Sequence, residues 1–208
     1  AGTFSLADTA RLLRIRGRAM QAAVPVGQGA MAALLGLSFD QAEAVAAEAA
    51  QGEVCQVANQ NDPAQNVVSG SKAAVERAID LAKAAGAKRA LLLPVSAPFH
   101  CALMAPAAEE MAGALADVTM NAPAVPVVAN VVAEAVTDPE QIRKLLIEQV
   151  TGQVRWMSSV EWMGAQGVTE VWEIGAGKAL SGMIRRINKE ITCVNIGTAA
   201  DAAAVKTA

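Results

Sequence analysis

His100, the single histidine of this 208-residue chain, lies in the stretch PVSAPFHCALM. A strand is predicted to end just before it, and strand ends are where α/β sheets gather catalytic groups. An imidazole can act there as a general base if a nucleophile lies within hydrogen-bond reach. Cys101 is adjacent, but neighbouring side chains of an extended segment diverge, and Ser96 lies in no G-x-S-x-G motif. The sequence therefore predicts either a base without a visible nucleophile or a histidine with a structural role.

One arginine occupies an unexpected position on the first predicted helix, residues 5–23. At 3.6 residues per turn, Arg16 falls in the middle of the apolar arc of this helix. The other arginines, which share the polar side, are Arg11, Arg14 and Arg18. A guanidinium that faces the core keeps its charge, so it must pair with an anion or face a polar cavity. The position alone leaves two interpretations open: an ion pair with a core carboxylate, or a bidentate clamp on a substrate carboxylate.

Two further patterns argue against phosphate-loop and metal chemistry. GAGK at 175–178 resembles part of a phosphate-binding loop, but that loop needs a glycine where Trp172 stands. A tight strand-to-helix turn is the predicted role instead. The three cysteines form no C-x-x-C pair, which is typical of a protein from a reducing compartment. We predict no metal site.

The charge and composition exclude several classes of protein. The net charge of −3 and the pI near 5.3 argue against nucleic acid as the main partner, because phosphate backbones require a basic surface. Hydrophobic residues make up 53% of the chain, yet no uninterrupted apolar stretch is long enough to span a bilayer. The sequence contains no signal-peptide pattern, so we expect a soluble, cytoplasmic protein that binds neither nucleic acid nor membranes.

The order of the predicted elements indicates two structural units. After the first helix the pattern is strand, helix, strand, strand, helix, strand, which is typical of a ferredoxin-like subdomain. These elements are expected at 29–37, 38–51, 53–58, 65–70, 71–85 and 88–95. We therefore assign residues 27–96 to a ferredoxin-like subdomain, inserted into a core that comprises residues 1–26 and 97–208.

Beyond the subdomain, strands and helices alternate, which predicts an α/β core with a parallel sheet. The helices are expected at 104–117, 139–150, 156–165 and 178–189, and the strands at 125–131, 169–174 and 191–196. The alanine-rich tail after Thr198 is predicted to be poorly ordered. The chain opens AGTFSLAD without a methionine, so we expect it to be a part of a longer polypeptide.

Five blocks of the chain resemble the malonyl-CoA:acyl carrier protein transacylases, which load malonyl groups for fatty acid synthesis. In chain order they are RGRAMQAAVPVGQGAMAALLGL at 16–37, NQNDPAQNVVSG at 59–70, AGAKRALLLPVSAPFHCALM at 85–104, IEQVTGQVRW at 147–156 and GAGKALSGMIRRI at 175–187. Several blocks in the right order are more specific than any single motif. The resemblance implies an α/β-hydrolase-like parallel-sheet core, incomplete in this chain, that carries a ferredoxin-like subdomain.

The resemblance also implies roles for individual residues. By this match His100 is the base for a nucleophilic serine in a GHSLG elbow, and that serine lies before Ala1. Arg16 matches the arginine that binds the malonyl carboxylate, which would explain a charge on an apolar face. Gln149 matches a glutamine whose backbone carbonyl orients the histidine. The last carbonyls of a helix have no intrahelical partner, so they are free to accept such a hydrogen bond.

Other matches concern the coenzyme A side and the acyl pocket. Asn61, Gln65 and Arg89 match positions on the coenzyme A side. The bulk of Phe99, just before the histidine, would narrow the pocket against a substituted malonyl group.

The chain departs from the family pattern in two turns. It has GAGK where the family has GPGK, and DPAQ at 62–65 where the family has SPGQ. Both changes concern backbone conformation. Carrier proteins of this kind are acidic, so a local basic patch is expected, with a solvated helix face as the alternative. The candidates are Arg185, Arg186 and Lys189.

The implied activity is the transfer of a malonyl group from malonyl-CoA to the phosphopantetheine thiol of acyl carrier protein, through a serine acyl-enzyme and without a cofactor. Arg16 would discriminate against uncharged acyl groups, because an acetyl group would leave it buried and unpaired. Two alternatives stay open: an acyltransferase domain of a polyketide synthase, and an inactive fragment that only binds carrier protein or CoA. Because the serine is not in this sequence, we expect the chain alone to be inactive, and the complete enzyme to be monomeric.

Overall fold

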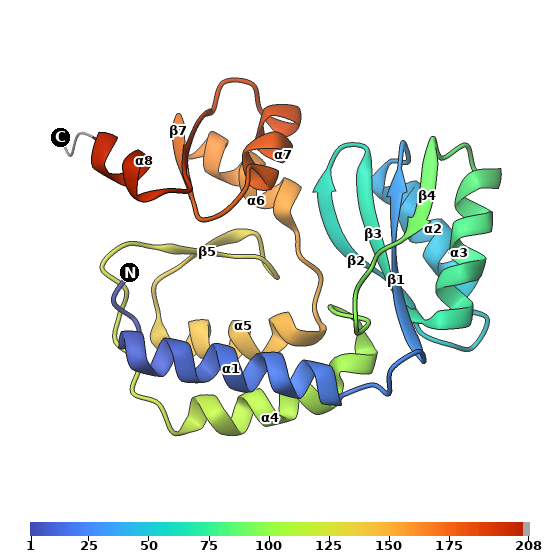
Figure 1. Cartoon of the computed structure of the whole chain (residues 1–208), viewed down its shortest axis with the longest axis horizontal. Coiled ribbons are helices and arrows are strands. Elements are labelled where there is room, and N and C mark those ends of the chain that lie inside the picture. The colour runs from blue at the N-terminus through green and yellow to red at the C-terminus, as the bar shows by residue number, and fades with distance from the viewer. Residues whose placement is uncertain (206–208) are drawn as a thin grey trace.

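The computed structural model describes residues 1–205, in which helices and strands alternate along the chain (Figure 1). The helices are α1 (Leu6–Ala22), α2 (Phe39–Ala50), α3 (Lys72–Ala84), α4 (Ala105–Ala116), α5 (Pro139–Thr151), α6 (Trp156–Ala165), α7 (Ala179–Ile187) and α8 (Ala199–Ala204), with a 3₁₀ turn η1 (Ala102–Met104). The strands are β1 (Gly29–Leu35), β2 (Cys55–Asp62), β3 (Gln65–Ser71), β4 (Arg89–Leu92), β5 (Val127–Ala129), β6 (Glu134–Val136), β7 (Glu170–Ile174) and β8 (Thr192–Ile196). Every helix and strand predicted above is present, with ends displaced by a few residues.

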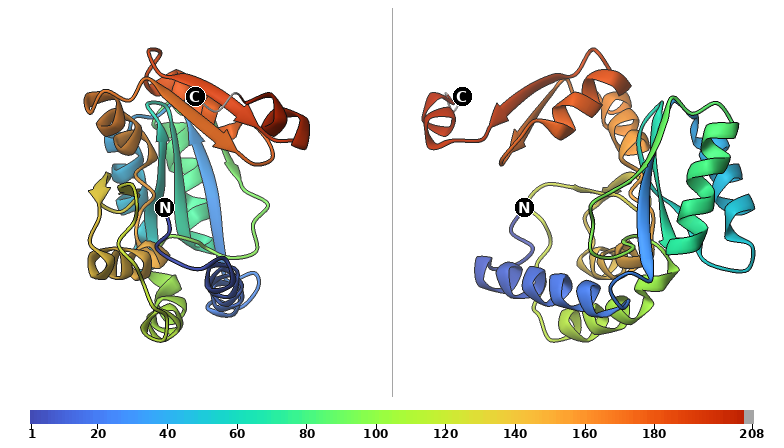
Figure 2. Two further views of the ribbon diagram at one scale, coloured as in Figure 1. Left: turned by 90° about the vertical axis from the view of Figure 1, so that its left-hand side faces the viewer. Right: turned by 45° about the vertical axis from the view of Figure 1, so that its right-hand side comes forward.

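The elements form three groups (Figures 1 and 2). Helices α1, α4 and α5 pack together at the bottom of Figure 1, with α4 in contact with both of the others. The sheet of β1 to β4, with α2 and α3, stands on the right, and α6, α7, β7 and β8 lie at the top. Strand β2 contacts both α6 and α7, so the sheet joins the upper group directly.

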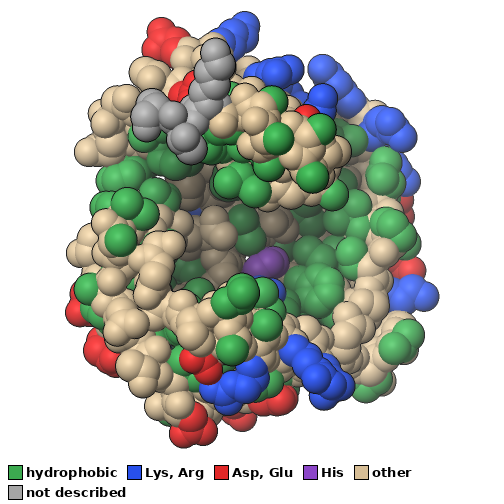
Figure 3. All heavy atoms as spheres, turned by 60° about the vertical axis from the view of Figure 1, so that its left-hand side comes forward, with side chains coloured by type: hydrophobic (Ala, Val, Ile, Leu, Met, Phe, Trp, Pro, Cys, Tyr) green, Lys and Arg blue, Asp and Glu red, His purple; other side chains and the backbone are tan. Residues whose placement is uncertain are grey.

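The surface is hollowed between these groups, and hydrophobic side chains line much of the hollow (Figure 3). The purple side chain in its wall is the single histidine. Several large hydrophobic side chains of the chain are exposed, including Leu13, Val127, Trp172 and Ile174. Among residues 1–205 no helix is both long and apolar enough to cross a membrane.

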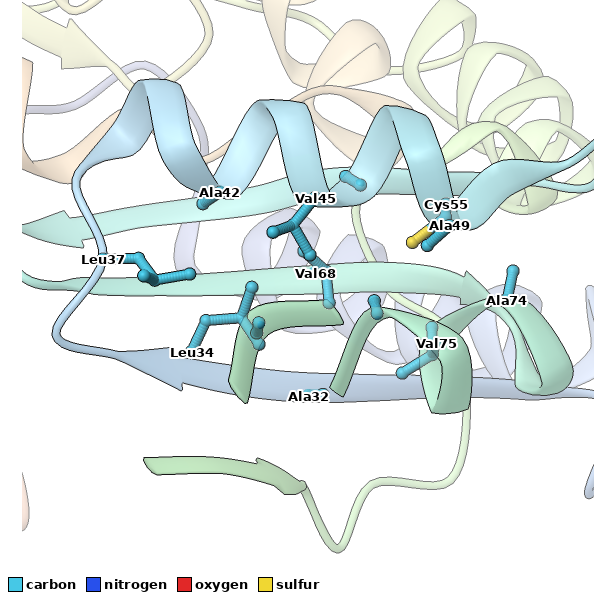
Figure 4. Close-up of a cluster of buried hydrophobic side chains, with 13 residues drawn as sticks. Ala32, Leu34, Leu37, Ala42, Val45, Ala49, Cys55, Val68, Ala74 and Val75 are labelled. Atoms are coloured by element: carbon cyan, nitrogen blue, oxygen red, sulfur yellow. The ribbon is translucent and has the colours of Figure 1, made fainter. Parts of the chain in front are cut away.

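Strands β1 to β4 form an antiparallel sheet in the order β2-β3-β1-β4, and α2 and α3 cover one of its faces (Figure 4). Side chains alternate along a strand, so Ala32 and Leu34 of β1 are buried against these helices. Met31 points to the opposite face, where it packs with Val67 of β3 and with Phe99. The face opposite α2 and α3, here called the open face, is therefore the one beside the histidine loop, and of its strands α6 and α7 contact chiefly β2.

The expected strand at 125–131 is only partly correct. Strand β5 spans Val127–Ala129 and pairs antiparallel with β6, a strand that the sequence analysis missed. Three-residue strands are too short to give a period-2 pattern, and the reversal between them uses Ala133 at a φ of 59°. Parallel pairing is found between β7 and β8, in agreement with the prediction for those two strands.

The tail after Thr198 was predicted to be poorly ordered, and for its first residues this is wrong. Helix α8 begins at Ala199 because Thr198 and Asp201 form a reciprocal capping box. The hydroxyl of Thr198 accepts the backbone N–H of Asp201 at 3.1 Å. The last part of that prediction, residues 206–208, lies outside the described residues.

Candidate active site

His100 lies in the loop between β4 and η1, with its backbone in the left-handed region at a φ of 58°. A residue with a Cβ rarely adopts this conformation, so neighbouring contacts must hold it. The side-chain oxygen of Gln56 on β2 accepts the backbone N–H of Ala102 at 2.7 Å. Phe99 packs on the open face of the sheet. Sequence reasoning missed Gln56, because its partner is a backbone amide 46 residues along the chain.

Gln149 orients the imidazole through its backbone. The carbonyl oxygen of Gln149, in the last turn of α5, lies 2.9 Å from Nδ1 of His100. A carbonyl can only accept a hydrogen bond, so Nδ1 carries the proton and Nε2 keeps its lone pair. The side-chain amide of Gln149 donates to the carbonyl of Gly152 at 3.0 Å and so ties down the end of its own helix. This is the geometry that a general base at Nε2 requires.

Arg16 is half-buried on α1 and has no ion pair within the described part of the chain. The interpretation of Arg16 as an ion-pair partner of a core carboxylate is therefore wrong for these residues. Burial lowers the pKa of the Arg16 guanidinium, because desolvation disfavours the charged form. The group nevertheless stays charged at neutral pH. What remains is a cation that faces a cavity without a protein anion.

That cavity is a pocket of about 280 Å³ between α1, α4 and α5. Arg16 and Gln149 both line it, and most of the other lining side chains are apolar. They are Phe4, Leu12, Leu13, Met111, Leu115 and Leu146, with Thr9 as a further polar group. An apolar pocket with one cation, next to the glutamine that contacts the histidine, is suited to a small acyl group that ends in a carboxylate.

The pKa of His100 is lowered from its ordinary value, mainly because burial disfavours the imidazolium. The hydrogen bond to the Gln149 carbonyl acts in the opposite direction, and the positive charge of Arg16 adds to the lowering. A lowered pKa keeps the imidazole neutral at physiological pH. The neutral form is the one that can accept a proton.

A proton NMR titration is expected to place the pKa of His100 below the ordinary value of about 6.5. The chain has one histidine, so its imidazole signal needs no assignment. Replacing Arg16 by glutamine should raise this pKa, because the imidazolium no longer faces a nearby cation. Arg18→Gln, an exposed change on the same helix, is the matched control. An equal rise in both variants would contradict a local effect of Arg16.

Within the described residues, neither the Ser96 hydroxyl nor the Cys101 thiol forms a hydrogen bond with this histidine. Cys101 is fully buried, its Sγ lies 3.2 Å from the Pro98 carbonyl, and burial raises the pKa of the thiol. Ser96 accepts a hydrogen bond from Gln21 at 2.6 Å. Within residues 1–205 the structure gives Nε2 of His100 no hydrogen-bond partner. His100 as a general base without a visible nucleophile therefore stays a prediction.

The residues assigned to the coenzyme A side lie at the end of the sheet where β1 and β2 end and β3 and β4 begin. Gln65 and Arg89 both pair with Leu35 of β1, one from each side, so the three side chains share one face. Asn61 lies on β2 next to Asp62, and Asp62 pairs with Gln65. The structure therefore gathers these residues along one rim, apart from the pocket of Arg16.

An ion pair at this rim was not predicted. The Nε of Arg186 on α7 donates to Oδ2 of Asp62 at 2.7 Å, although 124 residues separate them. Only 3% of the surface of Asp62 is exposed. The available signal was the DPAQ sequence, where the family pattern has a serine in place of Asp62. Of the three basic candidates, Arg186 thus contacts the sheet, whereas Arg185, also on α7, and Lys189, just beyond its end, are exposed.

GAGK at 175–178 forms the tight turn that was predicted, with Gly175 and Gly177 at positive φ. Helix α7 follows at once, and Glu173 at the end of β7 accepts the backbone N–H groups of Leu180 and Ser181. These hydrogen bonds to the start of α7 lower the pKa of Glu173, with the Ser181 hydroxyl as the largest cause. Within the described residues, no group of three or more His, Cys, Asp or Glu side chains is placed to hold a metal ion.

Comparison with known proteins gives one consistent family. Residues 1–146 match the family of the acyl transferase domain. The malonyl CoA-acyl carrier protein transacylase of Escherichia coli (strain K12) is 50% identical over 192 residues, which are 92% of this chain and 62% of the relative. The structure of acyl-carrier-protein-S-malonyltransferase from Bartonella henselae has a TM-score of 0.94 and 55% identity, covering 98% of this chain and 65% of that one.

A third similar structure contains a partner. It is a complex of a type II polyketide synthase acyl-carrier protein with its malonyl-transacylase, at a TM-score of 0.94 and 42% identity. The alignment covers 97% of this chain and 65% of that one. The chain thus spans slightly less than two thirds of the length of the relatives named here.

Proposed function

Since the chain belongs to the acyl transferase domain family, we propose that it is part of an enzyme that moves a malonyl group from malonyl-CoA to the phosphopantetheine thiol of an acyl carrier protein. The observation that carries the proposal is Arg16, a half-buried cation without a protein anion that lines a pocket together with Gln149. Gln149 in turn holds His100. A carboxylate clamp beside a base suits malonyl transfer better than transfer of an uncharged acyl group.

The proposed reaction is a ping-pong transfer through a serine of the GHSLG elbow, which this sequence does not contain. Nε2 of His100 takes the serine proton while the oxygen attacks the thioester carbonyl. The carbon–sulfur bond breaks, and the CoA sulfur leaves with the proton from His100. The carrier-protein thiol then gives its proton to His100 as its sulfur attacks the malonyl ester, and the serine oxygen recovers the proton. Arg16 holds the malonyl carboxylate through both steps.

The fold is proposed to serve this reaction as two units. The sheet order of residues 27–96 and the two helices on one face support a ferredoxin-like subdomain. Residues 1–26 and 97–208 would belong to an α/β-hydrolase-like core, with the serine elbow in a preceding segment. We propose that the reaction needs no cofactor, and that the complete enzyme is cytoplasmic and monomeric.

Two further assignments concern how the substrate is bound. Phe99 is proposed to narrow the acyl pocket against substituted malonyl groups, since it packs beside the histidine on the open face of the sheet. Asn61, Gln65 and Arg89 are proposed to contact the coenzyme A side, along the rim that they share.

The test is intact mass before and after incubation with malonyl-CoA. The full-length protein should gain one malonyl group and lose it on addition of holo-carrier protein, whereas acetyl-CoA should label it weakly. The 21.3 kDa chain alone should gain no mass, because it lacks the serine. A full-length protein that binds CoA but is never acylated would instead support a binding module.

A further inference from the structure

We propose that Arg186, held in place by Asp62, binds the phosphate at the end of the phosphopantetheine arm of both substrates, malonyl-CoA and the carrier protein. This inference rests on the proposed function, because it concerns how the same cleft holds its substrates. The phosphate is common to CoA and to the carrier protein, which both present their thiol on this arm.

Asp62 fixes the direction of the Arg186 side chain. Its Oδ2 accepts from Nε of Arg186 at 2.7 Å, and its Oδ1 accepts from the backbone N–H of Ala64 at 3.0 Å. A carboxylate that is 3% exposed is costly without a partner, so this pair is maintained. Helix α7 is thereby tied to the turn between β2 and β3.

The pair leaves the outer part of the guanidinium available. Nε is occupied by Asp62, and Nη2 lies 3.5 Å from Oε1 of Gln65, at the limit of a hydrogen bond. The Arg186 side chain remains 53% exposed. A guanidinium fixed at Nε presents its two Nη groups as a rigid fork, and this geometry matches two phosphate oxygens.

The position of Arg186 along the sheet fits an extended phosphopantetheine arm. Phe99, next to His100, packs on a cluster that includes Val67. Gln65 lies two residues before Val67 on the same strand and the same face, about 7 Å away at the rise of a β-strand. The Arg186 guanidinium lies next to Gln65 and its pairing partner Asp62. An extended arm that enters along this face, with its thioester at His100, would carry its phosphate toward Arg186.

A second cation lies in the same row. One residue from each strand, in the sheet order β2-β3-β1-β4, forms a row of cross-strand neighbours: Asp62, Gln65, Leu35 and Arg89. Arg186 stands over the β2 end of this row, and Arg89 forms the β4 end. A phosphate above the row would be attracted from both sides, although Asp62 offsets part of the Arg186 charge.

The test is Arg186→Gln in the full-length protein, with Arg185→Gln as the matched control. Both variants remove one positive charge from an exposed arginine of the same helix, but Arg186 is hydrogen-bonded to Asp62 whereas Arg185 is not. Loss of a charged hydrogen bond predicts a rise in KM of about 10-fold for malonyl-CoA and for holo-carrier protein. Arg185→Gln should change the KM for malonyl-CoA, which has no carrier-protein surface, less than about 2-fold. With malonyl-pantetheine, which has no phosphate, the penalty of Arg186→Gln should largely disappear.

A second variant separates binding from folding. Arg186→Gln leaves Asp62 buried and unpaired, so the double change Asp62→Ser with Arg186→Gln is made as well. It removes the buried charge and should recover the melting temperature while the KM for malonyl-CoA stays high. Equal penalties with malonyl-CoA and malonyl-pantetheine would overturn the inference in favour of a structural pair. A rise confined to malonyl-CoA would overturn the assignment to the shared phosphate.

Calorimetric titration with CoA repeats the comparison without turnover. Weaker binding of CoA to Arg186→Gln than to Arg185→Gln would support the inference even in a protein that does not transfer malonyl. In that case only the proposed function would fail. A wild-type protein that transfers malonyl, with equal CoA affinity in both variants, would refute the inference alone.

Discussion

Replacing His100 by glutamine in the full-length protein is expected to lower kcat for malonyl transfer by about 10³-fold. Glutamine fills similar space but cannot take a proton from the serine or return it to the leaving sulfur. KM for malonyl-CoA should change little, because the carboxylate clamp is intact. The measurement is steady-state transfer to holo-carrier protein, together with the rate of acylation in a single turnover.

The matched control is Cys101→Ala, which removes the thiol next to the histidine. The Cys101 thiol is fully buried, and burial raises its pKa, so it should contribute nothing to the chemistry. Transfer by this variant should stay within a few-fold of wild type. A loss comparable with that of His100→Gln would show that the thiol takes part and would contradict the assignment.

The acidic limb of the pH–rate profile should fall below pH 6.5. A general base works only when neutral, so activity is lost as pH drops through its pKa, and burial lowers the pKa of His100. Two measurements should therefore agree: the pKa of His100 from NMR of this chain and the pKa of the acidic limb of the full-length enzyme should both lie below the ordinary value. A limb above pH 6.5 would mean that another group controls the reaction.

Replacing Arg16 by alanine is expected to lower kcat/KM for malonyl-CoA by about 10²-fold, through loss of a charge-assisted pair with the carboxylate. The kcat/KM for acetyl-CoA should fall far less, or rise, because the variant has no buried cation that an acetyl group would leave unpaired. The measured quantity is the ratio of the two kcat/KM values. Discrimination in favour of malonyl should shrink by about the same 10²-fold.

Two variants separate this effect from general changes in charge. Arg16→Lys keeps the charge but not the planar fork, so it should recover only part of the preference for malonyl. Arg18→Ala removes an exposed charge from the same helix and should leave the ratio unchanged. A ratio that is insensitive to Arg16→Ala would exclude a carboxylate clamp at this position.

Local sequence signals predicted most elements correctly. Ser38 and Gln41 form the capping box that begins α2, and Asp138 caps α5 just before Pro139. Such signals depend on neighbours within one turn, so they can be read from the chain alone. The prediction failed where local patterns were short or mixed: β5 and β6 have three residues each, and the alanine-rich α8 depends on Thr198.

The sequence by itself determined that Arg16 is a charge on an apolar helix face and that His100 is a candidate base without a visible nucleophile, because helical periodicity and residue type are local properties. Only the tertiary structure decided what these groups meet. The carbonyl of Gln149 reaches His100 across 49 residues, and Asp62 meets Arg186 across 124. Pairings at such separations depend on how the sheet and helices pack, and packing is a property of the whole fold rather than of any one segment.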